Sequence, residues 1–214
     1  MIKYILFDLD GTLTNPKEGI TKCVQYALRH FGIQRECDEL ECFIGPPLKE
    51  QFMTYASLSE EDGIKAVELY RERFAPVGIF ENKIYDGIIP MLESLKNQGK
   101  VLALATSKPA VFAERIVDKY GIKPYLSYLS GSELDGRNTD KALVIKNAME
   151  ALGAVSANTI MVGDRMHDCE GAVKNGIRCI GAGYGFAAEG ELEAGGAEKI
   201  AKSPIELLQI LSAM

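Results

Sequence analysis

The chain has 214 residues, a net charge of −6 at neutral pH and a pI near 5.1. Its composition, 47% hydrophobic and 25% charged, is typical of a globular protein of one or two domains, and excludes disorder and a disulfide-stapled miniprotein. The acidic balance, without a dense run of Lys or Arg, excludes a nucleic-acid polymer as the expected partner. No apolar stretch reaches the roughly 18 residues of a membrane-spanning helix.

The start of the chain does not resemble a signal peptide, because its apolar run is short and acidic residues follow at once. The five cysteines are odd in number and form no CxxC pair, which is typical of reduced thiols that serve in packing. We therefore expect a cytoplasmic protein without a membrane partner, and either a monomer or a homodimer.

The first predicted element is a buried strand at Ile2–Phe7. Residues 15–85 then show helical periodicity and no convincing strand, with helices indicated at Val24–Phe31 and Ile64–Phe74. We therefore expect a small all-helical domain of residues 15–85, inserted after the first strand of another domain that comprises residues 1–14 and 86–214.

From residue 86 onward, apolar strand patterns alternate with amphipathic helix patterns. This alternation predicts an α/β fold, in which a Rossmann-like parallel sheet carries helices on both faces. The expected strands are Val101–Ala105, Tyr125–Leu129, Ile160–Val162 and Cys179–Gly181, and the expected helices are Ile88–Gln98, Val111–Tyr120, Lys141–Leu152 and Pro204–Leu211.

The strongest chemical signal is Asp8-Leu9-Asp10-Gly11-Thr12, at the end of the first strand. Residues two apart in an extended segment share a face, so Asp8 and Asp10 would both point into the crevice where open α/β sheets bind ligands. Two carboxylates this close repel, so one is protonated or a cation lies between them. The alternative is a turn with two solvated acids. A calcium loop of the EF-hand type is excluded, because Leu13 and Gly19 stand where it needs Gly and Glu.

Three further segments at strand or helix ends carry polar side chains. The hydroxyls of Thr106-Ser107-Lys108-Pro109 could meet a phosphate oxygen or simply cap a helix. Lys141 opposes the dipole of its helix, and is either solvated or aimed at a phosphate and a carboxylate. Asp164 and Asp168 follow another strand and, with the two acids of the first strand, make a cluster typical of an Mg²⁺ site. The alternative is that Asp164 caps a helix and Asp168 lies on the first turn of that helix.

These motifs, in this order, make the chain resemble the haloacid dehalogenase superfamily. The resemblance spans nearly the whole chain, and it places the helical insert where that family carries a small cap domain. Within the family, the chain looks most like a branch of bacterial 5′-nucleotidases, which lies close to the phosphoglycolate phosphatases. The phrases that carry this likeness are Asp10–Thr14, Phe43–Leu48, Ala105–Pro109 and Gly163–Asp168.

The resemblance implies that Asp8 is a nucleophile that forms an aspartyl-phosphate. It implies that Asp10 protonates the leaving oxygen and then activates water. Thr106 and Lys141 would hold the phosphoryl oxygens, and Lys141 would also hold Asp8 in place. The acid at position 10 favours phosphate-ester cleavage over carbon–halogen cleavage, because a departing alkoxide needs a proton and a halide does not.

The resemblance also implies Mg²⁺ as cofactor, bound by the Asp8 carboxylate, the Asp10 backbone carbonyl and Asp164, with Asp168 nearby. Gly45 and Pro46 lie in a rigid turn that would suit either a substrate-facing loop or a plain helix-to-helix connection. The full set of expected substrate-binding residues is Gly11, Thr12, Ser107, Lys108, Gly45 and Pro46.

Several other polar residues have two possible roles. Four residues of the helical insert could bind an anionic group, and a solvated helix face explains them as well: Lys49, Tyr70, Arg71 and Arg73. His167 is more typical of a helix residue beside an acidic loop than of a catalytic base.

We therefore expect an Mg²⁺-dependent phosphomonoester hydrolase for a small phosphorylated metabolite, with a nucleoside 5′-monophosphate as first choice. Phosphoglycolate is the alternative substrate. A phosphomutase of the β-phosphoglucomutase type shares the whole motif set and stays open. A non-catalytic binding module is disfavoured, because a protein that had lost catalysis would be expected to have lost some of the acidic residues of the motifs.

Overall fold

The computed structural model describes all of residues 1–214. The chain divides into two compact units, which we call the core unit (residues 1–15 and 84–214) and the inserted unit (residues 16–83). No helix in either unit combines the length and apolar character needed to cross a membrane.

The core unit is built on a six-stranded parallel sheet with the strand order β5-β4-β1-β6-β7-β8. The first strand, β1, is an inner strand whose Phe7 lies level with Leu104 on one side and Val162 on the other. Its apolar residues are fully buried, as expected for a strand covered on both faces. The predicted parallel sheet is confirmed. The strands are β1 (Tyr4–Phe7), β4 (Val101–Pro109), β5 (Leu126–Ser132), β6 (Thr159–Gly163), β7 (Arg178–Ala182) and β8 (Lys199–Ala201).

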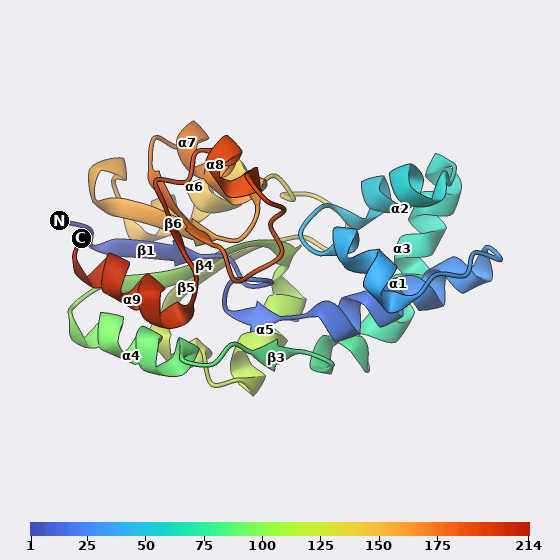
Figure 1. The fold of residues 1–214 in the computed structure, drawn as a ribbon, viewed down its shortest axis with the longest axis horizontal. Helices are drawn as coiled ribbons and strands as arrows, with labels where there is room; N and C mark the ends of the chain where they lie inside the picture. Colours follow the sequence, from blue (N-terminus) through green and yellow to red (C-terminus); the bar gives the residue numbers. More distant parts are fainter. The chain divides into compact units, whose positions relative to one another are not determined.

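Helices cover both faces of this sheet, with α6, α7 and α8 on one face and α4, α5 and α9 on the other (Figure 1). Local signals set their ends: the Asp140 side chain accepts a hydrogen bond from the Leu143 N–H at the start of α6, and Gly153 ends that helix with φ +59°. Cys169 and Cys179 pack in the apolar cluster beneath α6 and α7, which confirms a packing role for these two thiols. The helices are α4 (Ile88–Asn97), α5 (Ala110–Lys119), α6 (Lys141–Leu152), α7 (Met166–Lys174), α8 (Glu191–Gly195) and α9 (Pro204–Ser212).

The inserted unit is built almost entirely of helices. Ser59 caps α3 by accepting a hydrogen bond from the Asp62 N–H, and the Phe43 and Phe52 rings pack 5.0 Å apart in the interior. Two short strands, β2 (Thr14–Asn15) and β3 (Lys83–Ile84), pair where the chain passes between the units. The helical elements are α1 (Lys17–His30), the 3₁₀ helix η1 (Cys37–Phe43), α2 (Leu48–Ala56), α3 (Glu60–Phe74) and the 3₁₀ helix η2 (Gly78–Phe80).

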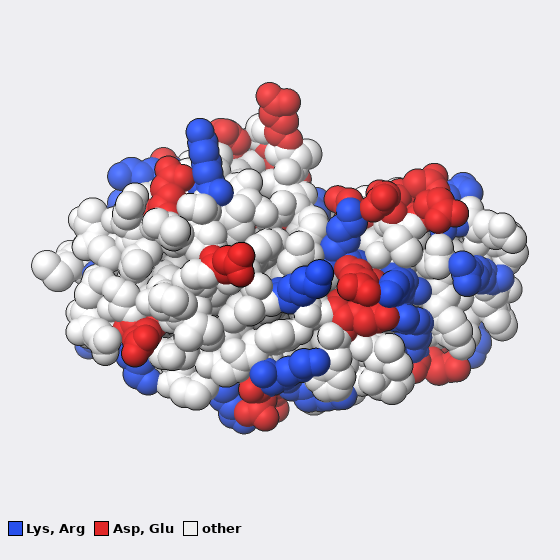
Figure 2. All heavy atoms as spheres, turned by 60° about the horizontal axis from the view of Figure 1, so that its bottom comes forward, with Lys and Arg blue, Asp and Glu red and all other residues white.

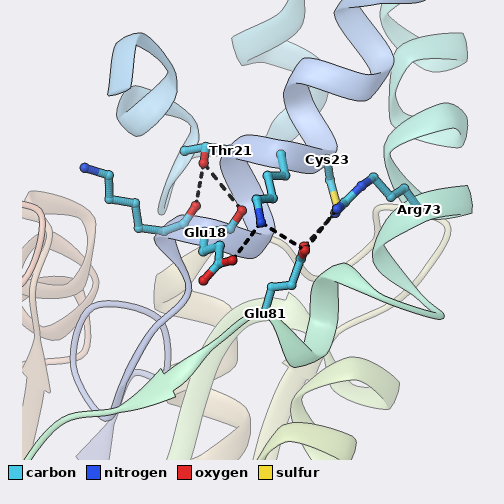
Figure 3. A network of polar contacts seen from close by, with 7 residues as sticks. Glu18, Thr21, Cys23, Arg73 and Glu81 are labelled. Atoms are coloured by element: carbon cyan, nitrogen blue, oxygen red, sulfur yellow. Dashed lines mark hydrogen bonds and ion pairs between the residues drawn. The ribbon is translucent and has the colours of Figure 1, made fainter. Parts of the chain in front are cut away.

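An ion-pair network ties the end of the inserted unit to its first helix (Figure 3). The Arg73 guanidinium donates to both carboxylate oxygens of Glu81, at 2.7 and 3.0 Å, and to the Cys23 thiol at 3.2 Å. Lys22 bridges from Glu81 to Glu18. The guanidinium of Arg73 is therefore engaged within the unit, which favours the structural reading of this residue over an anion-binding one.

The two other basic residues that could bind an anion in the inserted unit, Lys49 and Arg71, have different surroundings. Lys49 pairs with Glu60 at 2.9 Å, both side chains being well exposed, which is typical of a solvated helix face. Arg71 is partly buried, and this burial lowers the pKa of its guanidinium. On the face drawn in Figure 2, acidic and basic side chains are interspersed and no continuous basic patch forms.

Candidate active site

Three neighbouring strands bring the predicted site residues to one edge of the sheet. Phe7 lies level with Leu104 of β4 and with Val162 of β6, so the residues that follow Phe7, Leu104 and Val162 stand side by side at one edge of the sheet. The Asp8 N–H continues the ladder by donating to the Val162 carbonyl at 2.8 Å. The parallel register therefore brings Asp8 and Asp164 together from distant parts of the chain, as expected at the ligand-binding edge of such a sheet.

Lys141, at the first position of α6, lies between two carboxylates. Its Nζ is 2.7 Å from Asp8 Oδ1, 2.7 Å from Asp168 Oδ1 and 3.2 Å from the Ala105 carbonyl oxygen. Burial alone would lower the pKa of Lys141, but the carboxylates of Asp168 and Asp8 outweigh it and raise the pKa above its usual value. The side chain is only 9% exposed, so the solvated-lysine reading is wrong.

Three buried carboxylates gather beside this lysine. Asp8, Asp164 and Asp168 each offer an oxygen atom, and these atoms lie within 4.8 Å of one another. Asp164 Oδ2 accepts a hydrogen bond from the Phe186 N–H at 2.8 Å, whereas its Oδ1 is buried and has no hydrogen-bond partner. Burial raises the pKa of Asp164 well above its usual range, and the charges of Asp168 and Asp8 raise it further. An orphaned oxygen in such an all-oxygen cluster fits a hard divalent cation.

The two acids that follow β6 have different surroundings. Asp168 Oδ2 accepts a hydrogen bond from the Arg165 N–H at 3.0 Å, so Asp168 does cap α7 while its other oxygen pairs with Lys141. Asp164 precedes the capping residue Arg165 and faces the cluster instead. Helix capping thus explains the position of one carboxylate oxygen of Asp168, and it does not explain the position of Asp164.

Asp10 is paired with a lysine that we expected to bind substrate. Lys108 Nζ lies 2.8 Å from Asp10 Oδ2, with side-chain exposures of 7% and 12%. Asp10 Oδ1 is buried without a partner. Burial raises the pKa of Asp10, and the charge and hydrogen bond of Lys108 oppose this rise. The structure therefore places Lys108 against the expected acid and base of the site.

The helix-capping alternative for Thr106 and Ser107 is wrong. Strand β4 runs on to Pro109, which is the N-cap residue of α5 and makes no side-chain cap. Thr106 Oγ1 instead accepts a hydrogen bond from the Lys108 N–H at 3.3 Å, and the Ser107 carbonyl accepts one from the Ser132 hydroxyl at 2.8 Å. Thr106 is buried at the same strand edge as Asp8.

Gly11 meets two requirements that only glycine satisfies. Its φ is +84°, and a Cβ atom at this position would lie 2.0 Å from Asp164 Oδ2. The neighbouring Thr12 hydroxyl is buried and has no partner. The turn after β1 therefore passes directly against the acidic cluster.

Sequence reasoning missed a loop that closes over these residues. The segment Gly183-Tyr184-Gly185-Phe186 follows β7, and its Phe186 N–H binds Asp164. The Tyr184 hydroxyl donates to the Thr12 carbonyl at 3.0 Å, and a Cβ on Gly185 would lie 2.3 Å from the Asp164 Cβ. The signal available in the sequence was a Gly-x-Gly directly after a predicted strand, at the sheet edge that already carried the acids.

Gly45 and Pro46 belong to the inserted unit, between η1 and α2, and Gly45 has a φ of +105°. Their role in substrate binding stays a prediction. His167 is exposed on α7 with its ring 3.8 Å from Glu170, as expected of a solvated helix residue.

Comparison with known proteins agrees with this geometry. The family model described as haloacid dehalogenase-like hydrolase matches residues 5–182. The 5′-nucleotidase of Pseudomonas aeruginosa is 48% identical over 191 residues, which cover 89% of this chain and 86% of that protein. The phosphoglycolate phosphatase of Vibrio parahaemolyticus is 26% identical over 220 residues, covering 99% and 96%. The crystal structure of a predicted phosphatase from Clostridium acetobutylicum matches with a TM-score of 0.97 at 45% identity, over 100% of both chains. The chain therefore belongs to the haloacid dehalogenase-like hydrolases, and it groups there with phosphatases.

Proposed function

We propose that this chain is an Mg²⁺-dependent phosphomonoester hydrolase that acts on nucleoside 5′-monophosphates through an aspartyl-phosphate on Asp8. One observation carries the proposal: the Asp8 carboxylate is held by Lys141 beside the unpartnered oxygen of Asp164. Such a site combines a fixed nucleophile, a cation that can meet phosphoryl oxygens and a place for a metal ion.

The reaction has two steps. An Asp8 oxygen attacks phosphorus, the ester P–O bond breaks, and Asp10 gives its proton to the departing alkoxide. Asp10 then takes a proton from water, the water oxygen attacks phosphorus, and the bond from phosphorus to Asp8 breaks to release inorganic phosphate. Burial raises the pKa of Asp10, and the charge and hydrogen bond of Lys108 oppose this rise. Lys141 and Thr106 hold the phosphoryl oxygens while these bonds change.

Asp8, Asp164 and the Asp10 backbone carbonyl would hold Mg²⁺. When bound, the ion offsets the repulsion between an anionic nucleophile and an anionic phosphate. Asp168 Oδ2 accepts a hydrogen bond from the Arg165 N–H, and Asp168 Oδ1 forms an ion pair with Lys141 without accepting a hydrogen bond. We therefore assign Asp168 to positioning Lys141, close to the ion.

The proposed substrate class rests on the similarity of this chain to the 5′-nucleotidase of Pseudomonas aeruginosa. We propose that the inserted unit is the cap, and that Gly45 and Pro46 of its η1–α2 turn contact the substrate. Phosphoglycolate is the second candidate, because the relative from Vibrio parahaemolyticus is a phosphoglycolate phosphatase and matches nearly the whole chain.

The test is phosphate release from nucleoside monophosphates, phosphoglycolate and sugar phosphates, with Mg²⁺ and with EDTA. We expect nucleoside monophosphates to be preferred and EDTA to stop release. Asp8→Asn should abolish turnover, whereas Asp118→Asn, on the exposed side of α5, should match the wild type. Preference for phosphoglycolate would change only the substrate. Isomerisation of a sugar phosphate without phosphate release would establish a mutase, and inactivity on every ester would contradict the proposal.

A further inference from the structure

Lys108 lies in an irregular segment at the end of β4. Ala105 pairs with Ser130 of β5, and the next paired residue of β4, Pro109, pairs with Ser132, so β4 carries extra residues between these two positions. A bulge of this kind breaks the regular alternation of side chains along a strand, and bulges beside active sites often aim a side chain at the site. The direction of the Lys108 side chain is therefore set by this local irregularity.

Neighbouring residues hold the bulge in one shape. The Lys108 N–H donates to Thr106 Oγ1 at 3.3 Å, and the Ser132 hydroxyl donates to the Ser107 carbonyl at 2.8 Å. A Cβ atom on Gly131 would lie 2.9 Å from the Lys108 carbonyl oxygen, which is closer than Cβ atoms come, so only glycine lets β5 pass here. The backbone of Lys108 is thus fixed independently of the contacts that its side chain makes.

The side chain of Lys108 reaches one oxygen of Asp10 and leaves the other free. Its Nζ lies 2.8 Å from Asp10 Oδ2, and both side chains are little exposed. Asp10 Oδ1 is buried and has no hydrogen-bond partner. An unpartnered buried oxygen in a native protein calls for an explanation, and a role in the reaction is one. With Oδ2 held by the ammonium, the carboxyl group is restrained from turning and presents Oδ1 alone.

A structural role explains this ion pair poorly. Buried ion pairs add little to stability, because the loss of hydration offsets the attraction between the charges. Nor is Lys108 needed as the cation beside the nucleophile, since Lys141 already lies 2.7 Å from Asp8. The observations are best explained if Lys108 acts on Asp10 itself.

We propose that Lys108 is a positioning residue, whose ammonium holds Asp10 Oδ2 so that Oδ1 faces the leaving oxygen of the substrate. The proton then passes from Oδ1 to that oxygen as the ester P–O bond breaks, and Lys108 keeps its own protons. The inference rests on the proposed function and deepens it, because it gives Lys108 a role on the acid of the site instead of a contact with the substrate.

The decisive variant is Lys108→Met, assayed with two substrates that need the acid to different degrees. A nucleoside monophosphate releases an alkoxide that needs a proton, whereas p-nitrophenyl phosphate releases a stabilised phenolate that does not. The value of kcat/KM reports the steps up to departure of this group. It should fall roughly 100-fold for the nucleotide and less than about threefold for p-nitrophenyl phosphate, as expected for a misplaced general acid.

Three further variants control this comparison. Lys108→Arg keeps a cation and should recover part of the loss with the nucleotide. Ser132→Ala removes a hydrogen bond that holds the bulge, and should show the same dependence on the leaving group to a smaller extent. Lys100→Met is the matched control, because Lys100 precedes the opposite end of β4 and donates to the Ile2 carbonyl at 2.7 Å. It should leave the ratio of the two kcat/KM values at the wild-type level.

Equal losses with both substrates would mean that Lys108 binds the phosphoryl group, and would overturn the inference. An unchanged or increased kcat/KM for the nucleotide would also overturn it, because loss of the positive charge alone favours a protonated Asp10. If Lys108→Met does not fold, Ser132→Ala decides, and an unchanged ratio there overturns the inference. A wild type that hydrolyses no ester would remove the proposed function and this inference together, whereas the other results, with an active wild type, overturn the inference alone.

Discussion

The Lys141 ammonium lies 2.7 Å from the Asp8 carboxylate, although 133 residues separate the two in the chain. The same ammonium is 2.7 Å from Asp168, so one buried cation is shared by two buried carboxylates. Removal of one partner from a buried charge group leaves the others uncompensated, which is more costly than loss of an exposed pair.

Lys141→Met should therefore lower the free energy of unfolding by about 3 kcal/mol and abolish phosphate release. Urea unfolding in EDTA measures the first effect. Lys146→Met is the control, because Lys146 lies on the same helix and pairs with Glu150 on its exposed face. That variant should change stability by less than about 0.5 kcal/mol. Similar losses in both variants would show that Lys141 is not the central charge of the cluster.

Asp164→Asn should make the metal-free protein relatively more stable as the pH rises. Burial raises the pKa of Asp164 in the folded state, so the folded state binds more protons than the unfolded state above about pH 4. Wild-type stability then falls with rising pH by a contribution that the variant lacks. The measurement is urea unfolding in EDTA at pH 4.5, 6 and 7.5, and the stability of the wild type minus that of the variant should become steadily more negative.

The effect of Mg²⁺ on thermal stability is a second test of the role of Asp164. The ion should raise the melting temperature of the wild type, because the proposed metal site exists only in the folded state, and it should raise that of Asp164→Asn much less. Asp118→Asn should behave like the wild type at each pH and with Mg²⁺. A parallel pH dependence in wild type and Asp164→Asn would count against a buried, charged Asp164.

A comparison of Gly11→Ala with Gly32→Ala separates the effect of backbone strain from the effect of a steric clash between the new Cβ and the acidic cluster. Both glycines have positive φ values, +84° and +72°, so both alanines carry strain of order 1 kcal/mol. Only at Gly11 would the new Cβ lie against Asp164, at 2.0 Å from Oδ2, because Gly32 has open space around it. Gly11→Ala should therefore also abolish activity and stabilisation by Mg²⁺, whereas Gly32→Ala should keep both. Normal activity in Gly11→Ala would disprove the close approach.

Arg73→Met should loosen the inserted unit without touching the acidic cluster. Its guanidinium makes two hydrogen bonds to Glu81, and both side chains are less than a quarter exposed. We expect a loss of about 1 kcal/mol, seen as faster hydrogen exchange in residues 16–83. Lys65→Met, which breaks an exposed pair with Glu68, should leave exchange nearly unchanged. Unaltered exchange in Arg73→Met would mean that the network in Figure 3 adds little to the stability of this unit.

The sequence predicted the acids and the lysine of the site because each follows an apolar strand or opens a helix with strong periodicity. Asp8 and Asp164 could be placed at one edge by the rules of parallel sheets. The position of Lys141 beside Asp8 was implied only by the family resemblance, because Lys141 opens a helix and follows no strand. The pairing of Lys108 with Asp10 could not be predicted, because it depends on side-chain directions across two strands.

Other elements were missed for reasons of length and pattern. Strand β8 has three residues, too few for a period to show, and α2 buries only Phe52 fully, so its apolar face is weak. Tyr85 and Tyr184 were missed as a pair because their contact joins segments far apart in the chain and involves no motif with fixed chemistry.

The strand order also bears on how the protein is made. β1 pairs only with β4 and β6, which begin at Val101 and Thr159, so β1 is synthesised well before either of its sheet partners. At about 5–20 residues per second, β4 follows roughly 5–20 s later. During that interval Ile5, Leu6 and Phe7, which end fully buried, are exposed on the nascent chain. The strand that precedes Asp8 therefore depends on a sheet partner that is made much later than itself.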